Sequence, residues 1–500
     1  MAGRFLRAFK TISRFMPEIK AAERKVGFNE KIFWTFLALA IYLVMAEVPL
    51  FGISASAGWN MTALRVIFAS NRGTLMELGI GPIVTAGIIL QLLGGSGMIE
   101  MDMSNPEDRG LFTGATKFFA IVLTGVQASA YLIGGAYGSL SAGVSLIVFL
   151  ELLSAGVIVM LLDELVQKGW GFGSGISLFI LGGVAQTIFW DMFSPAPLSA
   201  GQSLGLFVAL AQRLAEGGSL VRSLSNMVNG HASLFIRQTF DTSTGTLGSN
   251  YPGIVGFIAT IVVFLIVIYA EGVRVELPVS QADYKGYRSR YPIKLLYVSN
   301  LPVIFASALF ANVYFFSQLF WSANGQPAPG KNLWLDLLGQ YIVPASTSGQ
   351  TSQPQPVGGL VYYVLAPSSP YAVANNPLRA FVYLSILVIF CVVFSLTWLE
   401  VGGLGAHAVA EQLVDSGMHI PGYRRSSKPI ELLLKRYITP VTILGGIIVG
   451  LIAGFADFFG AFGSGMGILL SVGIIYQYYQ LLLQERAAEM FPAFRRVLGE

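Results

Sequence analysis

The chain has 500 residues, of which 54% are apolar and 12% charged, and its mean hydropathy is +0.66. Soluble domains carry about twice this charged fraction, which argues strongly against a water-soluble enzyme. The 31 Lys and Arg residues exceed the 27 Asp and Glu residues by a net charge of +4, too little to indicate a nucleic-acid-binding protein. The single cysteine, Cys391, excludes an intrachain disulfide and a thiolate metal cluster.

Apolar runs long enough to cross a membrane recur along the whole chain. A transmembrane helix needs about 20 mostly apolar residues. Ten such helices are expected, at residues 31–50, 80–96, 111–136, 143–166, 174–192, 251–275, 293–317, 377–400, 437–455 and 464–485. The second run is the shortest of them. The sequence therefore predicts an all-α polytopic membrane protein with ten transmembrane helices.

These spans form two groups of five, joined and flanked by more polar segments. The expected parts are an amphipathic cytoplasmic helix within 1–30, a first five-helix half at 31–192, a long outer loop at 193–250, a second five-helix half at 251–485 that includes cytoplasmic loops at about 276–292 and 401–436, and a cytoplasmic tail at 486–500. The amphipathic stretch ends at Pro17 and has one apolar and one basic face, as in helices that lie on a membrane surface. A second long outer loop is expected at about 318–376.

The distribution of basic residues predicts the orientation, because cytoplasmic segments carry an excess of Lys and Arg. With the N-terminus inside and ten alternating spans, 24 of the 31 Lys and Arg residues fall on the inner side. One span fewer or more in the middle would place the basic segments 285–294 and 424–436 on opposite sides of the membrane. We therefore expect a multi-pass protein of the cell membrane with both termini in the cytoplasm.

Two short motifs recur at matching positions in the two halves. Phe-Gly-Ser-Gly at 172–175 opens the fifth predicted span, and the same four residues at 462–465 open the tenth. The second span of each half also has a proline near its start, Pro82 and Pro302. Paired interruptions of this kind indicate an inverted repeat with its working site between the halves. The alternative is coincidence, because Gly and Pro are frequent in membrane helices.

The sequence lacks a His-Glu-x-x-His zinc motif and a phosphate-binding loop. Glu151 is the one acidic residue well inside a predicted span, and a lone acid there is more often paired or protonated than catalytic. Pumps and ion-coupled transporters usually carry ionisable groups at membrane depth. We therefore expect no enzyme activity, no metal and no cofactor.

The segment at 51–79 is too long for a tight turn and too polar to span a membrane. A short re-entrant or plugging element fits it, because non-helical backbone at membrane depth is tolerated where protein or a wet cavity shields it. An ordinary outer loop fits the spacing equally well.

Four stretches carry a resemblance to the SecY-type protein-conducting channels. Leu-Gly-Ile-Gly-Pro-Ile-Val-Thr-Ala at 78–86 resembles the signature that follows the plug in this family. Similar matches link 173–186 to its fifth helix, 291–300 to the start of its seventh and 456–478 to its tenth-helix region. The resemblance runs from about residue 30 to 490 except for the two outer loops, and it favours the archaeal and eukaryotic branch.

The resemblance implies an hourglass channel made of two inverted five-helix halves. Such a channel moves unfolded secretory polypeptides across the membrane and releases transmembrane segments sideways into lipid. Its gates are a plug, a ring of aliphatic side chains and a lateral gate. A ring of this kind excludes water and ions. The ring positions implied here are Ile80, Val84, Ile176, Ile180, Ile304 and Ile452.

The resemblance also implies the plug and the polar residues of the lateral gate. The plug corresponds to about 59–73, and Gln91, Gln127 and Asn300 fall on helices that flank the lateral gate. Each amide has an alternative role, because a buried amide often satisfies a local backbone group. Without the family, helix or lipid packing is likewise the simpler reading of any single isoleucine in the ring.

The basic cytoplasmic loops correspond to the ribosome-docking loops of the family. The residues concerned are Lys285, Arg288, Arg290, Arg424 and Arg425. Basic side chains attract phosphate-rich RNA, so RNA is expected as a partner only through the ribosome. The alternative is that these charges serve membrane orientation alone. Other implied partners are a SecE-type gamma subunit, a small beta subunit, nascent chains, signal sequences and the lipid bilayer.

Two other classes of protein remain open from the sequence. A secondary transporter with inverted repeats would have a polar solute site at the membrane midplane. A passive scaffold would need neither a channel nor a mobile plug.

Overall fold

The computed structural model describes residues 16–24, 26–53, 73–95, 106–133, 137, 140–196, 203–215, 237–241, 246–281, 288–298, 301–325, 327, 330–342, 355–367, 369–415, 418–419 and 427–490. The chain divides into two compact units. The first unit contains Met1–Thr187, Phe310–Tyr362 and Leu470–Glu500, and the second contains Ile188–Leu309 and Tyr363–Leu469.

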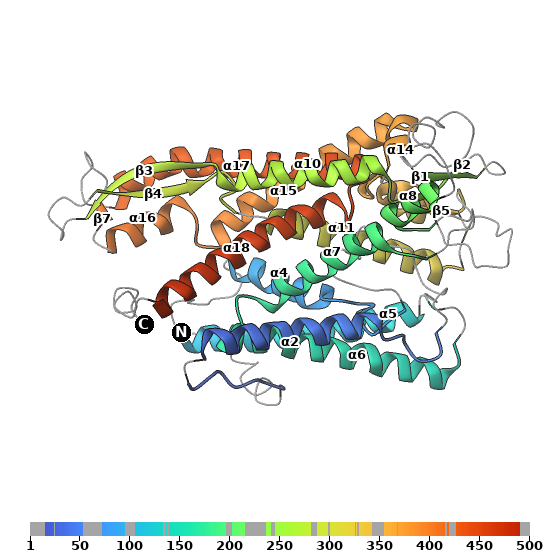
Figure 1. The fold of residues 1–500 in the computed structure, drawn as a ribbon, viewed down its shortest axis with the longest axis horizontal. Helices are drawn as coiled ribbons and strands as arrows, with labels where there is room; N and C mark the ends of the chain where they lie inside the picture. Colours follow the sequence, from blue (N-terminus) through green and yellow to red (C-terminus); the bar gives the residue numbers. More distant parts are fainter. Residues whose placement is uncertain are drawn as a thin grey trace. The chain divides into compact units, whose positions relative to one another are not determined.

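The helices of the first unit are mostly long and apolar (Figure 1). They are α2 (Phe28–Glu47), α4 (Gly81–Gly95), α5 (Pro106–Ile133), α6 (Ala142–Leu165) with the π-helix η1 (Val166–Trp170), most of α7 (Gly175–Phe193), the later parts of α11 (Leu301–Ala323) and α18 (Gly465–Met490), and the short α12 (Leu333–Leu338). A small hairpin of β5 (Gln340–Ile342) and β6 (Gln355–Gly358) precedes α13 (Gly359–Val364).

The second unit combines long helices with two small antiparallel sheets. Its helices are α8 (Leu206–Ala215), α10 (Ile254–Gly272), α14 (Pro370–Asn375), α15 (Pro377–Val401), α16 (Ala406–Asp415) and α17 (Ser427–Phe458), with the starts of α11 and α18. One sheet pairs β1 (Arg237–Asp241) with β2 (Thr246–Tyr251). The other has the order β4 (Arg288–Lys294), β3 (Arg274–Gln281) and β7 (Met418–His419).

Within the described part of the chain, nine helices are long and apolar enough to cross a membrane. The apolar helix at Gly81–Gly94 is shorter. The 15 residues of α4 extend only about 22 Å at 1.5 Å per residue, which is less than the roughly 30 Å of the hydrocarbon core. The prediction of a helical, multi-pass membrane protein is therefore confirmed, and its shortest span is also the shortest in the structure.

Two predicted boundaries differ from the structure. The seventh span was expected from residue 293, but α11 begins at Leu301 because residues 293 and 294 complete β4. The cytoplasmic loop expected at 401–436 contains α16 and the first turns of α17. The amphipathic stretch expected within 1–30, which ends at Pro17, lies outside the described residues except for residues 16 and 17, so it stays a prediction. Periodicity in apolar residues missed the strands because polar and basic residues interrupt them.

Helices α15 and α17 pack closely along a stripe of glycines. A Cβ added at Gly446 would lie 3.1 Å from the Cα of Val392, and one at Gly450 would lie 3.0 Å from the Cα of Val388. At Gly454 the added atom would meet the Leu384 side chain at 2.5 Å. The missing side chains therefore allow the two backbones to approach, as in other small-residue helix contacts.

The sheet of β3, β4 and β7 is fixed to the helices of its unit by an apolar cluster. Leu277 of β3 and Ile293 of β4 pack in one buried cluster with Leu399, Val409 and Ile430. Figure 1 shows β3 and β4 as two strands side by side that extend beyond the end of α10. Only Val273 separates α10 from β3, so the sheet follows the helix directly and packs on the helices of its own unit.

Candidate functional site

The start of α7 is held by a carboxyl group from the end of α6. The backbone N–H of Ile176 donates to Oδ1 of Asp163 at 2.9 Å. A Cβ on Gly175 would lie 2.5 Å from the Cα of Asp163, so only glycine fits this approach. Gly173, two residues earlier, has φ 67°, in the left-handed region that favours glycine. The motif at 172–175 therefore forms a tight turn, and the helix that follows it is capped by the Asp163 carboxyl group.

The start of α18 is built in the same way in the other half of the sequence. The backbone N–H of Gly465 donates to Oδ1 of Asp457 at 2.7 Å. The hydroxyl of Tyr383 donates to the other oxygen of this carboxyl at 3.0 Å. Gly463 has φ 70°, and a Cβ on Gly465 would lie 2.2 Å from the carbonyl oxygen of Ala453. The repeated motif therefore corresponds to a repeated structure, and coincidence no longer explains it.

Sequence reasoning missed Asp163 and Asp457, although a signal for both was present. Each aspartate lies near the end of one apolar run and shortly before the Phe-Gly-Ser-Gly motif that opens the next. An acidic residue in that position can accept from the free N–H groups at a helix start. Both carboxyl groups are buried, with exposed fractions of 8% and 5%, which agrees with this role.

The prolines of the second span in each half also occupy equivalent positions. Pro82 is the second residue of α4, and Pro302 is the second residue of α11. A proline here costs no helical hydrogen bond, because the first N–H groups of a helix have no partner within it. Gly79, with φ 54°, forms the turn before α4. Both prolines thus mark helix starts rather than kinks.

The expected ring positions lie on or directly beside helix starts. In the first unit, Ile80 precedes α4 directly and is fully buried, and Val84 follows one turn later and is partly exposed. Ile176 is partly exposed in the first turn of α7, and Ile180 one turn on is 2% exposed.

In the second unit, Ile304 lies in the first turn of α11, and Ile452 lies on α17; both are partly exposed. If the two repeated motifs are aligned, Ile176 and Ile180 correspond to Met466 and Leu470 on α18. The repeat therefore adds two candidates for the channel wall that the family resemblance did not supply.

The amide residues of the expected lateral gate are only partly described. Gln91 lies on α4 and Gln127 on α5, and both side chains are half-buried. Asn300 lies outside the described residues, immediately before α11. The plug expected at 59–73 also falls outside them except for Gly73. Glu151, the acid inside α6, accepts from the backbone N–H of Phe51 at 3.0 Å, so it has the local partner expected of it.

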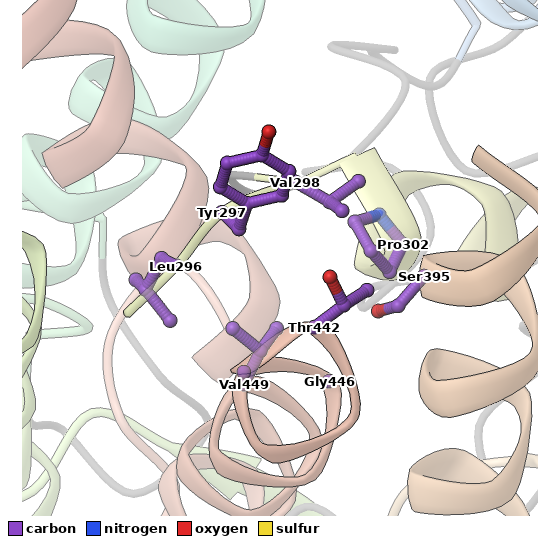
Figure 2. A pocket seen from close by; sticks show the side chains of 9 residues that line it. Leu296, Tyr297, Val298, Pro302, Ser395, Thr442, Gly446 and Val449 are labelled. Carbon is purple, nitrogen blue, oxygen red and sulfur yellow. The ribbon is translucent and has the colours of Figure 1, made fainter. Parts of the chain in front are cut away.

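A small cavity lies where the chain enters α11. It has a volume of about 10 Å³, enough for one water molecule. Figure 2 shows Val298, Pro302, Ser395 and Thr442 gathered around this space. A Cβ on the nearby Gly445 of α17 would lie 2.7 Å from the carbonyl oxygen of Leu295. The segment that leads into α11 is therefore packed directly on α17.

The basic loop between α10 and α11 is a paired hairpin in its described part. Arg290 is exposed on β4, and its guanidinium donates to Glu276 of the neighbouring strand at 2.7 Å. This hydrogen bond and the positive charge of Arg290 hold the pKa of Glu276 below its usual range. Arg288 lies on the same strand, while Lys285, Arg424 and Arg425 lie outside the described residues.

Solved structures of channels resemble this chain over nearly its whole length. One described as "The structure of a protein conducting channel" is 36% identical, with a TM-score of 0.74 and coverage of 96% of this chain and 98% of the other. The Sec61 channel from the canine ribosome-channel complex of the endoplasmic reticulum has the same identity and coverage and a TM-score of 0.72. The yeast Ssh1 complex on the 80S ribosome is 25% identical, with a TM-score of 0.72 and coverage of 95% and 93%.

The fold and these likenesses define the chain as the pore subunit of a protein-conducting channel. Residues 74–479 match the SecY family, and residues 41–73 match the plug domain of Sec61p. The chain belongs to the SecY family and carries its plug domain. Membership in this multi-pass channel family confirms the predicted role as the pore subunit of a protein-conducting channel and the prediction that the chain is not an enzyme, and it removes the solute-transporter and scaffold alternatives.

Proposed function

We propose that this chain forms the path by which unfolded secretory polypeptides cross the membrane, and that it releases transmembrane segments sideways into lipid. The observation that carries this proposal is the pair of capped Phe-Gly-Ser-Gly helix starts, one in each half. They fix the first turns of α7 and α18 rigidly. A gate needs such fixed walls if only the plug, near 59–73, and the lateral gate are to move.

The proposed ring consists of Ile80, Val84, Ile176, Ile180, Ile304 and Ile452. Aliphatic side chains seal by dewetting. They offer a passing chain no hydrogen-bond partner, so the ring does not select one polypeptide sequence over another. The repeat makes Leu470 of α18 a competing candidate for the place of Ile452. Cross-linking at each position distinguishes the two.

Gln91, Gln127 and Asn300 are proposed as the polar latch of the lateral gate. Hydrogen bonds between amides hold helices together in lipid by roughly 0.6 kcal/mol on average. A latch of that size keeps a gate closed at rest and yields to an apolar segment. Replacement of Gln127 by Leu is expected to change how hydrophobic a segment must be for release.

The basic residues Lys285, Arg288, Arg290, Arg424 and Arg425 are proposed to dock the ribosome. Arg290 supports this because it projects from a hairpin that is anchored by a buried apolar cluster. Two similar channels are described in complexes with ribosomes. Charge reversal of Arg424 and Arg425 is expected to weaken ribosome binding and to leave membrane topology intact. Unchanged ribosome affinity at low salt would contradict this role.

The remaining parts of the proposal concern the surroundings of the chain. We place it in the cell membrane with both termini in the cytoplasm, as the distribution of Lys and Arg predicts. We also expect a SecE-type gamma subunit and a small beta subunit as partners. Protease protection of tags at either terminus tests the orientation, and purification of the tagged chain with its partners tests the subunits.

Cross-linking to a translocating chain tests the proposed path. Cys391 is first replaced, because it is the single native cysteine. Single cysteines at Ile80 or Ile304 are then probed with a ribosome-stalled secretory chain. Matched controls are Leu265 of α10 and Phe381 of α15, whose side chains are exposed by 60% and 69%. We expect cross-links at both ring positions only, and only with a functional signal sequence. Equal cross-linking at the controls would refute the ring.

A further inference from the structure

A short helix after α11 presents an apolar face that the described residues of the chain do not cover. On α12, Leu333, Trp334 and Leu337 are 81%, 86% and 64% exposed. Their spacing places them on one side of the helix, whereas Leu335, Asp336 and Leu338 are partly buried on the other. Exposure of such an apolar face to water is unfavourable, which indicates that the face contacts either lipid or another protein.

The depth of α12 follows from its contact with α11. Gly339 comes directly after α12, and a Cβ there would lie 2.5 Å from Oγ of Ser317. Ser317 lies six residues before Ala323, where α11 ends, or about 9 Å along the helix axis. The 23 residues of α11 extend about 35 Å, slightly more than the roughly 30 Å hydrocarbon core. Ser317 therefore lies on the hydrocarbon side of the boundary, and the end of α12 lies beside it.

Contacts on both sides of α12 hold the segment that contains it beside α11. The Tyr341 hydroxyl and Oγ of Ser317 are 3.1 Å apart. The Trp321 ring packs against the Tyr341 ring at 5.2 Å between centroids. Asp336 accepts from the backbone N–H of Gly330 at 2.9 Å, which ties the helix to the loop before it. Phe316 and Phe320 of the apolar helix α11 are also exposed, by 47% and 50%, as expected of side chains that face lipid.

We propose that α12 is an interfacial anchor whose Leu333, Trp334 and Leu337 side chains insert into the membrane leaflet at the C-terminal end of α11. Tryptophan and leucine on one face are typical of helices that lie at this boundary, and the apolar face of such a helix is buried about 5–10 Å into it. The anchor holds the segment between α11 and α15 against the membrane. This inference does not depend on the proposed polypeptide path, because it concerns the lipid surface alone.

Spin labels in reconstituted channels test the anchor. In a Cys391→Ala background, cysteines at Trp334 or Leu337 are labelled in phosphatidylcholine–phosphatidylglycerol vesicles. Collision with oxygen, which concentrates in lipid, is compared with collision with a water-soluble nickel chelate. Phe320→Cys is the lipid-facing control, and Lys331→Cys, on an exposed residue of the preceding loop, is the water-facing control.

We expect both α12 labels to favour oxygen over the nickel chelate, at a depth between those of the two controls. The Leu337→Cys variant retains Trp334 and so tests the anchor without loss of its largest side chain. Nickel accessibility equal to that at Lys331 would overturn the proposal, because α12 would then face water. Low collision rates with both reagents would also overturn it, because the face would then be covered by protein.

Discussion

Replacement of Asp457 by alanine tests the capped start of α18 most directly. The Asp457 carboxyl accepts from the N–H of Gly465 at 2.7 Å and from the Tyr383 hydroxyl at 3.0 Å. Tyr383 is 1% exposed, so its hydroxyl has no access to bulk water once the carboxyl is gone. The variant therefore loses two hydrogen bonds and leaves a buried donor unsatisfied.

The expected cost of Asp457→Ala is about 2–6 kcal/mol in the free energy of unfolding. Each lost hydrogen bond contributes roughly 0.5–1.5 kcal/mol, and the unsatisfied hydroxyl roughly 1–3 kcal/mol. Tyr383→Phe removes the donor itself and is expected to cost only about 1 kcal/mol. In a Tyr383→Phe background, Asp457→Ala is expected to cost less, because no hydroxyl is then stranded. The coupling energy between the two sites is expected to be about 1–2 kcal/mol.

Unfolding of the purified channel in mixed detergent and SDS micelles measures these differences. Ser385→Ala is the matched control, because Ser385 lies on α15 near Tyr383 and its hydroxyl donates to the Phe381 carbonyl of its own helix. Additive effects of the two substitutions, or an Asp457→Ala cost no larger than that of the control, would refute the capping argument.

Three further predictions concern packing and charge. Gly450→Leu is expected to destabilise the α15–α17 contact by about 1–3 kcal/mol, since even an added Cβ would lie 3.0 Å from the Cα of Val388. Gly143→Ala is the control and should be nearly neutral in the same unfolding assay, because a Cβ added there meets no atom of the described neighbours within 4 Å. Glu164→Gln is expected to cost about 3 kcal/mol, because Glu164 pairs with Lys117 at 2.6 Å and both side chains are nearly buried; a cost as small as that of Glu30→Gln would contradict it. The hydrogen bond to Glu431 and the negative charge of Glu411 raise the pKa of His407 in the folded protein. The positive charge of His407 therefore stabilises the fold fully below the pKa of the unfolded chain, about 6.5. This stabilisation is lost as pH rises through the pKa of the folded protein. Wild type should then exceed His407→Gln in thermal midpoint at pH 5.5 but not at pH 9, and a constant difference would contradict the pairing.

The long helices were predictable from sequence because lipid imposes one simple requirement, about 20 apolar residues per span. For α10 and α15, the expected ranges 251–275 and 377–400 agree with the structure to within a few residues. The repeated Phe-Gly-Ser-Gly motif likewise predicted the equivalent helix starts. Where the chain leaves lipid, hydropathy carries no information, and for that reason β3, β4 and α16 were not predicted.

The candidate site was only partly predictable. The aliphatic ring positions came from a resemblance to known channels, because an isoleucine that lines a channel has the same chemistry as one that faces lipid. The carboxyl caps needed three-dimensional proximity, since Asp163 and Ile176 are separated by a turn whose path depends on the φ of Gly173. The exposed face of α12 was missed because six residues are too few to show a helical period.

The base of the β3–β4 hairpin has a mechanical meaning. The backbone N–H of Leu295 donates to the carbonyl of Val273 at 2.8 Å, so one further hydrogen bond closes the base of the hairpin directly after α10. The two strands are therefore joined at their base, and a load on either strand reaches the end of α10. By thermodynamic linkage, whatever grips the hairpin more tightly in one arrangement of α11 favours that arrangement by the same factor. A ligand of the hairpin that prefers one arrangement of the helices would therefore also distinguish that arrangement from the others.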